Sequence, residues 1–437
     1  MSRRLLLSVI LLSLVTGAYF FYGRSGADGD TEPGFVSEAT DESAPDGTPG
    51  PGSNPQSSVD PAVTPTAIPT PVLIPEDAII VGAIVDKTGI MRRLDEPALE
   101  AARIQIGRVN AAGGVLGRPL VLKEFDSRSQ LNASFQAAQE LIEDGIELLL
   151  VTCEYQFAKP AIDIATAAGV LVLSPCGGTS EWGVPAVAGR NVFSFAMPST
   201  LEGKLMAEFV LAEKGPLVTL IVDKQDPDAF AQCEGFQDEF VANGGSFRGR
   251  LEVTLENVVE LEEMLSTLLR TSFSTPNAVV LCASPAVGQD VVLYLRRAGL
   301  ESPIVAGSTM DGDSWIVNVE RTGSMQVLSY ASVYGDDPDP AIRELFAEYE
   351  TLTGAAPAQG RPVTGADAIA AFALAAERAG SLDLNDLIAE LEQFDAQPLV
   401  AGTITFNENS HLSTRSMRLI EIVDDQPAFE RIIEPEA

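Results

Sequence analysis

The chain has 437 residues, of which 46% are hydrophobic, and this length exceeds the usual size of one core, so two lobes or domains are expected. It carries 62 Asp and Glu against 28 Lys and Arg, a formal net charge of -34. So acidic a surface repels nucleic-acid phosphates and anionic lipid headgroups, which argues against both as partners. A soluble or salt-adapted surface explains the charge, and a cationic ligand is the alternative explanation.

Histidine chemistry depends on a single residue, His411. A Ser-His-Asp triad or a multi-histidine metal site would have to be built around it alone. The polar run 407–411 instead predicts a solvated turn. Neither the GxxxxGK[ST] phosphate loop nor the GxGxxG dinucleotide fingerprint occurs in the sequence. The sequence therefore predicts a protein that is not an enzyme and that uses no metal or cofactor.

Residues 1–22 have the pattern of an export segment, because Arg3 and Arg4 precede an apolar run from Leu5 to Tyr22. The run has two possible fates. It ends in a cleavable signal near Ala18, or it stays as a membrane anchor, since about 18 apolar residues nearly span a bilayer. Either fate places the following chain outside the cytoplasm, at the cell surface or in the periplasm.

Residues 23–76 are rich in Pro, Gly, Ser, Thr, Asp and Glu and contain hardly any large apolar side chain. Such a segment cannot bury enough apolar surface to offset the entropy of ordering it. The composition predicts a disordered, extended linker between the export segment and a folded module.

From residue 78 onward, short apolar runs alternate with segments of helical spacing. Apolar runs of four to eight residues are typical of buried parallel strands, and the intervening helices of 10 to 15 residues indicate βαβ crossovers. The first series comprises strands at 78–85, 119–125, 147–152 and 170–175 and helices at 97–110, 133–144 and 160–168.

A second series repeats this pattern, which predicts two similar doubly wound halves. Its strands are expected at 218–222, 247–253, 278–282 and 303–306, with helices at 230–242, 259–269 and 286–298. Three late helices at 341–353, 365–379 and 384–394 and two late strands at 403–406 and 415–423 complete the chain.

Several segments in this order resemble the branched-chain amino-acid-binding family of ABC transporter solute-binding proteins. The first is IGRVNAAGGVLGRP at 106–119, and five more segments follow it with the family's order and spacing. These are AAQELIEDGIELLL (137–150), AIDIATAAGVLVLSP (161–175), YLRRAGLESPIVAG (294–307), AIRELFAEYETLTG (341–354) and GTITFNENSH (402–411). Together they span about residues 78 to 423.

The resemblance implies the type I periplasmic-binding fold, with two doubly wound parallel-sheet lobes joined by three hinge crossovers. It places lobe 1 at 77–198 plus 334–400 and lobe 2 at 199–333 plus 401–437. A small ligand is expected in the cleft that faces the carboxyl ends of both sheets.

On lobe 1, the resemblance implies three binding loops, and the first keeps Thr88 and Gly89 but has Leu94 where the family has an aromatic residue. The loop after the strand ending at Val151 carries Glu154 and Tyr155 where the family usually has serine. The third loop is the Ser174 to Thr179 turn, in which Ser174, Cys176 and Gly177 bring backbone amides to a ligand carboxylate and Thr179 adds a hydroxyl. For Thr179, a helix-capping role is the alternative.

On lobe 2, the resemblance places binding positions at Asp226, Ser284 and Thr309. An acid that holds the ligand's ammonium group is expected just after Ala306, and Asp311 is the candidate. A solvated turn aspartate is the alternative reading of Asp311. These positions depart from the family pattern, so the identity of the ligand does not carry over.

The four cysteines suit an exported protein, because disulfides persist outside the cytoplasm. Cys153 and Cys176 end consecutive strands of lobe 1, whereas Cys282 ends a lobe 2 strand and Cys233 lies in the helix after a neighbouring strand. One bridge within each lobe is therefore expected, Cys153–Cys176 and Cys233–Cys282.

The function implied is that of an ABC importer's binding protein for an amino acid or similar small polar solute, with permease subunits as partners. A membrane-tethered extracellular sensor of the same fold is the alternative.

Overall fold

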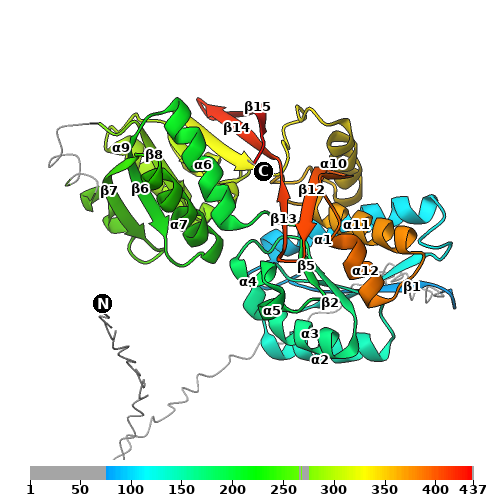
Figure 1. Ribbon diagram of the computed structural model, residues 1–437. Helices are drawn as coiled ribbons and strands as arrows, with labels where there is room; N and C mark the ends of the chain where they lie inside the picture. The colour runs from blue at the N-terminus through cyan, green and yellow to red at the C-terminus, as the bar shows by residue number, and fades with distance from the viewer. Residues whose placement is uncertain (1–74, 265–266, 268–274, 436–437) are drawn as a thin grey trace, which may run out of the picture. The chain divides into compact units, whose positions relative to one another are not determined.

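The computed structural model describes residues 75–264, 267 and 275–435 (Figure 1). The predicted export segment 1–22 and almost all of the predicted linker 23–76 lie outside these residues. The predicted helix 259–269 is described only in part. Within the described ranges, no helix combines the length and the apolar character that a membrane crossing needs.

The first of two sheets has eight strands, and five of them run parallel to one another from one edge of the sheet inward. In the inner four of these five strands nearly all side chains are buried on both faces, as expected where helices cover a parallel sheet, whereas the edge strand at 120–126 is mostly half-buried. In spatial order the strands are β11 (Gln397–Leu399), β12 (Gly402–Asn407), β13 (Ser410–Arg415), β5 (Val192–Ser194), β4 (Leu171–Ser174), β3 (Leu148–Val151), β1 (Ile79–Val85) and β2 (Leu120–Asp126).

Eight helices accompany this sheet, and we call the sheet with these helices the first lobe. They are α1 (Arg92–Ala111), α2 (Leu131–Glu143), α3 (Tyr155–Ala168), α4 (Ser180–Gly183), α5 (Pro185–Ala188), α10 (Pro340–Thr353), α11 (Val363–Ala379) and α12 (Leu384–Leu391). The late helices thus return to the first sheet, where α11 packs against α1.

The second sheet has seven strands, again with a parallel centre and an antiparallel edge formed by the last two. Its strands in spatial order are β15 (Gln426–Ile433), β14 (Met417–Val423), β10 (Ser324–Ser329), β9 (Ile304–Ala306), β8 (Ala278–Cys282), β6 (Leu217–Asp223) and β7 (Ser246–Val253). We call it, with α6 (Ser199–Glu213), α7 (Pro227–Ala242), α9 (Pro285–Arg297), η1 (Val258–Glu260), η2 (Ser308–Met310) and η3 (Ile316–Asn318), the second lobe.

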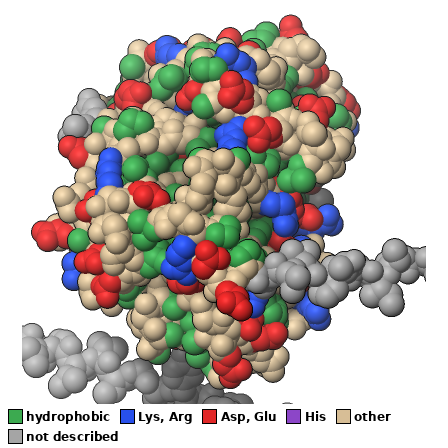
Figure 2. Space-filling view, turned by 90° about the vertical axis from the view of Figure 1, so that its right-hand side faces the viewer, with side chains coloured by type: hydrophobic (Ala, Val, Ile, Leu, Met, Phe, Trp, Pro, Cys, Tyr) green, Lys and Arg blue, Asp and Glu red, His purple; other side chains and the backbone are tan. Residues whose placement is uncertain are grey.

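The chain passes between the two sheets three times, after β5, after β10 and at Ser416. A buried apolar cluster joins α6 and α7 to residues of α1 and α10, including Ile104 and Phe346, so the lobes share a core near the crossovers. On the face drawn in Figure 2, acidic and basic side chains are interspersed with apolar ones.

The third crossover differs from the sequence prediction, which assigned 401–437 to lobe 2. The strand pairing puts β12 and β13 in the first sheet, where Leu412 is in register with Ser194 of β5. A buried ion pair connects β13 to the first lobe, because the Arg415 guanidinium lies 2.9 Å from Asp367 of α11. The single strand predicted at 415–423 is therefore divided at Ser416.

The predicted turn is present and exposed at residues 408 and 409, but the solvated position predicted for His411 is wrong, since His411 lies fully buried on β13. Its ring stacks on Phe193 with centroids 3.8 Å apart, and Nδ1 lies 2.9 Å from the carbonyl oxygen of Val192. Burial lowers the pKa of His411, an effect opposed by its contacts with Val192 and Glu392. The residue is part of the packing of the first lobe.

Two disulfides join the same cysteines that the strand order predicts. Cys153 and Cys176 lie 4.9 Å apart between Cα atoms, beyond the ends of β3 and β4. Cys233 of α7 pairs with Cys282 at the end of β8, with Cα atoms 5.8 Å apart. Each bridge stays within one lobe, so neither restrains movement of one lobe against the other.

Candidate ligand cleft

A cavity of about 490 Å³ lies between the lobes, at the carboxyl ends of strands from both sheets. Open α/β sheets bind ligands at this edge, because the loops that follow the strands converge there. We call it the cleft cavity. Its lining consists of Ile90, Met91, Glu154, Gln156 and Phe157 from the first lobe and Asp223, Gln225, Asp226, Pro227, Leu255 and Ser284 from the second.

Glu154 enters the cleft cavity because it caps α3, the helix that follows β3. Its carboxylate accepts a hydrogen bond from the backbone N–H of Gln156 at 3.4 Å. Burial raises the pKa of Glu154, and the charges of Asp228, Asp226 and Glu181 raise it further. Two of those acids belong to the second lobe, so the two lobes present carboxylates to each other.

Asp226 occupies the matching position on the second lobe, where it caps α7 after β6. Oδ1 accepts a hydrogen bond of 2.9 Å from the N–H of Ala229. Burial raises the pKa of Asp226 to about 6, with a further contribution from Asp228 and an opposing one from Arg361. A carboxyl group of this kind ionises more readily when a cation approaches it.

Ser284 precedes α9 and closes the same side of the cleft cavity. Its hydroxyl donates a hydrogen bond of 2.8 Å to Oδ2 of Asp223, the last residue of β6. The same oxygen accepts from the N–H of Ser284, and Oδ1 accepts from the N–H of Gln225 at 3.0 Å. Of the ten residues predicted to bind ligand, Glu154, Asp226 and Ser284 line this cavity.

The remaining predicted residues of the first lobe are mostly engaged in its own packing. The Tyr155 ring packs edge-on against Trp182, and its hydroxyl donates to the carbonyl of Val187. Ser174 Oγ accepts the N–H of Gly177, and Cys176 is in its disulfide.

The glycine pair after Cys176 allows close packing, by Gly177 within the first lobe and by Gly178 between the lobes. A Cβ on Gly177 would overlap the indole of Trp182. One on Gly178 would approach Ser199 and the Asp228 carboxylate of the second lobe. The Gly178 carbonyl accepts the N–H of Ser199 at 2.8 Å, so this loop is in contact with the first crossover.

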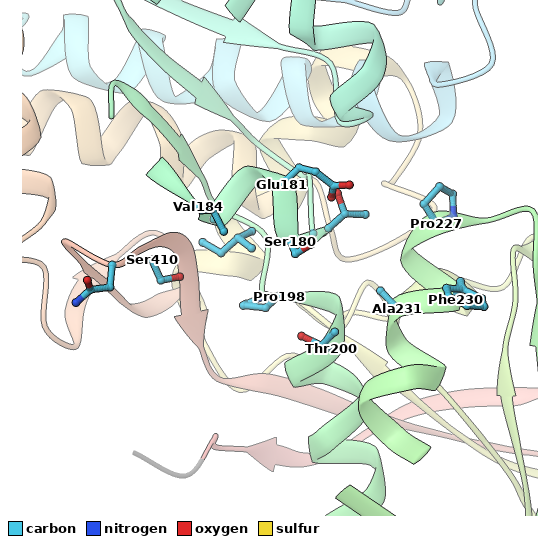
Figure 3. A pocket seen from close by; sticks show the side chains of 14 residues that line it. Ser180, Glu181, Val184, Pro198, Thr200, Pro227, Phe230, Ala231 and Ser410 are labelled. Atoms are coloured by element: carbon cyan, nitrogen blue, oxygen red, sulfur yellow. The ribbon is translucent and has the colours of Figure 1, made fainter. Parts of the chain in front are cut away.

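Thr179 lies in a second cavity, of about 430 Å³, which shares Pro227 with the cleft cavity. Figure 3 shows Ser180, Glu181 and Val184 of the first lobe facing Thr200, Phe230 and Ala231 of the second. Thr179 is half-buried at the start of α4, and its side chain makes no capping hydrogen bond. Its hydroxyl is therefore available to the cavity.

Thr309 and Asp311 are buried away from both cavities. The Thr309 hydroxyl donates to Gln232 at 3.1 Å. The Asp311 carboxylate accepts hydrogen bonds from Ser329 Oγ at 2.8 Å and from the N–H groups of Gly360 and Gly312. Burial raises the pKa of Asp311 to about 6 against these hydrogen bonds and the charge of Arg361.

Arg361, which sequence reasoning missed, fills the space between the predicted binding loops. It belongs to the loop before α11 and is only 4% exposed. Nη1 donates to the Cys176 carbonyl at 3.0 Å and Nη2 to the Ser308 hydroxyl at 2.8 Å, so one side chain bridges the two lobes. Its guanidinium also lies 3.9 Å from Asp228 and over the ring of Tyr330.

One further cluster has the composition of a metal site. Within the described ranges, donor atoms of Asp95, Cys153 and Cys176 lie within 4.8 Å of one another. The two sulfurs are joined in a disulfide, so neither is a thiolate ligand. Asp95 instead accepts hydrogen bonds from the N–H groups of Asp86 and Cys153, and burial raises its pKa to about 7.

The sequence matches the family model described as periplasmic binding protein over residues 78–427. Among curated relatives, the Leu/Ile/Val-binding protein homolog 3 of Brucella melitensis is 25% identical over 350 residues. The match covers 78% of this chain and 91% of that protein.

Two solved structures illustrate the structural likeness. The branched-chain amino acid transporter substrate binding protein of Streptococcus pneumoniae, in complex with isoleucine, has a TM-score of 0.68 at 16% identity and covers 82% of this chain and 100% of that one. A solute binding protein of an ABC transporter from Rhodopseudomonas palustris, in complex with 3,4-dihydroxy benzoic acid, has a TM-score of 0.69 at 17% identity. That match covers 82% of this chain and 98% of the other. At these identities the likeness shows the fold, and it confirms the predicted fold class.

Proposed function

Because the chain belongs to the periplasmic binding protein family, we propose that it is the solute-binding protein of an ABC importer and closes its lobes around a small polar solute. The predicted resemblance to the branched-chain amino-acid-binding proteins is confirmed by the family match and by the relatives. Members of this family are binding proteins rather than enzymes, and they work outside the cytoplasm.

The cleft cavity carries this proposal. Loops after β1, β3, β6, β7 and β8 all contribute to it, so a solute there would contact both sheets. Its volume is within the range of small-molecule sites. A solute that contacts both lobes stabilises the closed arrangement by its differential affinity for that state.

The proposal also covers the N-terminal segments and the transporter subunits that would receive the solute. The apolar run 5–22 and the polar linker 23–76 are suited to holding the module outside the membrane, with or without cleavage of the run. Permease subunits of the importer would then receive the solute from the closed lobes.

A solute screen against the full-length protein tests the function. Amino acids, amides and small amines are screened by thermal shift, and each hit is followed by calorimetry and X-ray scattering. A bound solute should raise the melting temperature, since 100-fold excess over Kd adds about 2.7 kcal/mol of stability, and it should reduce the radius of gyration.

A steric variant localises the site of any hit. Gln156→Trp places an indole in the cleft cavity and should abolish binding, whereas Lys159→Trp, on the same helix but outside the lining, should retain it. Hits whose affinity is unchanged by Gln156→Trp would place the site elsewhere. A screen in which no solute alters melting or compactness would contradict the proposal.

A further inference from the structure

We propose that the cleft cavity selects an organic cation with an apolar body, such as an alkylamine, and does not require a carboxylate on its ligand. This inference rests on the function proposed above, and it narrows the solute class at the same site. It depends on the charges of the lining, on the state of the helix amides and on the apolar rim.

The lining has one sign of charge. Of its eleven residues, Glu154, Asp223 and Asp226 are acids, and none is Lys or Arg. Outside the lining, the guanidinium of Arg361 is engaged with the Cys176 carbonyl and the Ser308 hydroxyl, and that of Arg93 interacts electrostatically with Asp226. A ligand carboxylate in the cleft cavity would therefore meet repulsion without a lining cation to offset it.

The backbone amides that usually hold an anion are already occupied in part. Helix N-termini bind carboxylates through their free N–H groups, and three helices begin at this cavity. The chain's own acids take these donors: Glu154 accepts from Gln156, Asp226 from Ala229 and Asp223 from Ser284. At each of these helix starts, therefore, an acid of the protein already takes one of the donors that a ligand carboxylate would use.

Two carboxylate oxygens remain for a cation. Among the described residues, each of Glu154 and Asp226 has one oxygen that accepts a backbone hydrogen bond and one with no protein donor. They belong to opposite lobes, and the charge of Asp226 contributes, after burial, to the raised pKa of Glu154. A ligand ammonium between them would form charge-assisted hydrogen bonds to both lobes.

The rim of the same cavity is apolar. Ile90 on the first lobe is 79% exposed and Leu255 on the second is 58% exposed, and both line the cavity with Met91 and Phe157. Large apolar side chains left in water on both sides of a cleft are typical of a surface that a ligand covers. A bare metal ion would leave them exposed, so the rim favours an organic cation.

Three compounds with a common apolar end separate the possible ligand classes. L-leucine has both charges, 3-methylbutylamine lacks its carboxylate, and 4-methylpentanoate lacks its ammonium. Calorimetry with the full-length protein at pH 7.5 should show the amine binding at least as tightly as leucine and no binding of the acid. Calcium chloride, measured in parallel, should give no heat.

Variants of the two acids test the contact. Glu154→Gln and Asp226→Asn should each weaken amine binding at least tenfold, and Asp226→Glu should restore part of the affinity. Asp383→Asn removes the charge of a helix-capping carboxylate of the same kind on α12, outside the cleft, and should leave the affinity unchanged. The melting temperature of each variant reports whether it is folded.

The outcomes separate this inference from the proposed function. The proposal of a cationic ligand is overturned if leucine binds and the amine does not, or if amine binding survives both acid variants. In either case the proposed solute-binding function still stands. Binding of calcium in place of the amine overturns the organic ligand. If no compound from this set or from the wider screen binds, both proposals fail.

Discussion

Replacing Arg361 by glutamine tests whether one buried side chain joins the lobes. The variant loses the two hydrogen bonds that its charged guanidinium donates, to Cys176 and to Ser308. Hydrogen bonds to charged groups are worth about 1.5–3 kcal/mol each, and breaking a buried charge pair costs about 3–5 kcal/mol. We expect a loss of about 3–5 kcal/mol in the free energy of unfolding.

A second effect of the same substitution concerns pH. Glu202 is buried, and burial raises its pKa while the charge of Arg361 and hydrogen bonds from Ser308 and Tyr330 lower it. Without Arg361 the pKa of Glu202 rises further, and the folded state then binds the proton more tightly than the unfolded chain does. The loss of stability should therefore be larger at pH 8 than at pH 5.

Urea unfolding followed by circular dichroism at both pH values measures these effects. Arg297→Gln is the control, because Arg297 forms a solvent-exposed ion pair with Glu320 and its removal should leave the midpoint unchanged. A cost for Arg361→Gln below about 1 kcal/mol at pH 8, or one that does not depend on pH, would refute the bridging role.

Three further predictions concern the cleft and its supports. Because the pKa of Asp226 is raised to about 6, amine affinity should fall about tenfold between pH 8 and pH 5 as this acid is protonated, and Asp226→Asn should flatten the profile. Non-reducing peptide mass spectrometry should find the bridges Cys153–Cys176 and Cys233–Cys282. Replacing both cysteines of a bridge by serine should lower the free energy of unfolding, by about 3 kcal/mol for the 23-residue loop and by about 4 kcal/mol for the 49-residue loop. Gly177→Ala should lower the free energy of unfolding, measured with urea, by about 1–3 kcal/mol through overpacking against Trp182, whereas Gly107→Ala, where a Cβ meets open space, should not. A cross-lobe disulfide or a neutral Gly177→Ala would contradict the packing described here.

The order of the elements was predictable because it depends on local patterns. The apolar run at 78–85 is β1 with its first residue removed, and the strands at 147–152 and 170–175 correspond to β3 and β4. The strands β5 and β10 were not predicted, because polar residues such as Ser194 and Gln326 interrupt their apolar runs. The burial of β13 was not predicted, since it depends on Phe193 and Asp367, which are distant in the sequence.

The site was predictable only where a residue follows a strand directly. Glu154, Asp226 and Ser284 come within a few residues of β3, β6 and β8, and the topology alone brings them to one cavity. Arg361 could not be found in this way, because it contacts Cys176 across 185 residues and nothing in its local sequence distinguishes it. Its presence between the predicted loops moves the candidate ligand site outward, from Asp311 toward Glu154 and Asp226.

The two groups of charges act on closure in opposite directions. Arg361 joins the lobes on the inner side, whereas Glu154 and Asp226 bring like charges together across the cleft cavity. In the absence of a cation this repulsion opposes closure, so an ammonium group that offsets it couples binding to closing. Neutralising one acid should then mimic part of the ligand's effect: Asp226→Asn without solute should have a smaller radius of gyration than the parent protein in X-ray scattering at low salt. The difference should shrink at high salt, where screening weakens the repulsion. If the variant and the parent have the same dimensions at both salt concentrations, the acids do not control closure, and the cation must act through contacts other than charge.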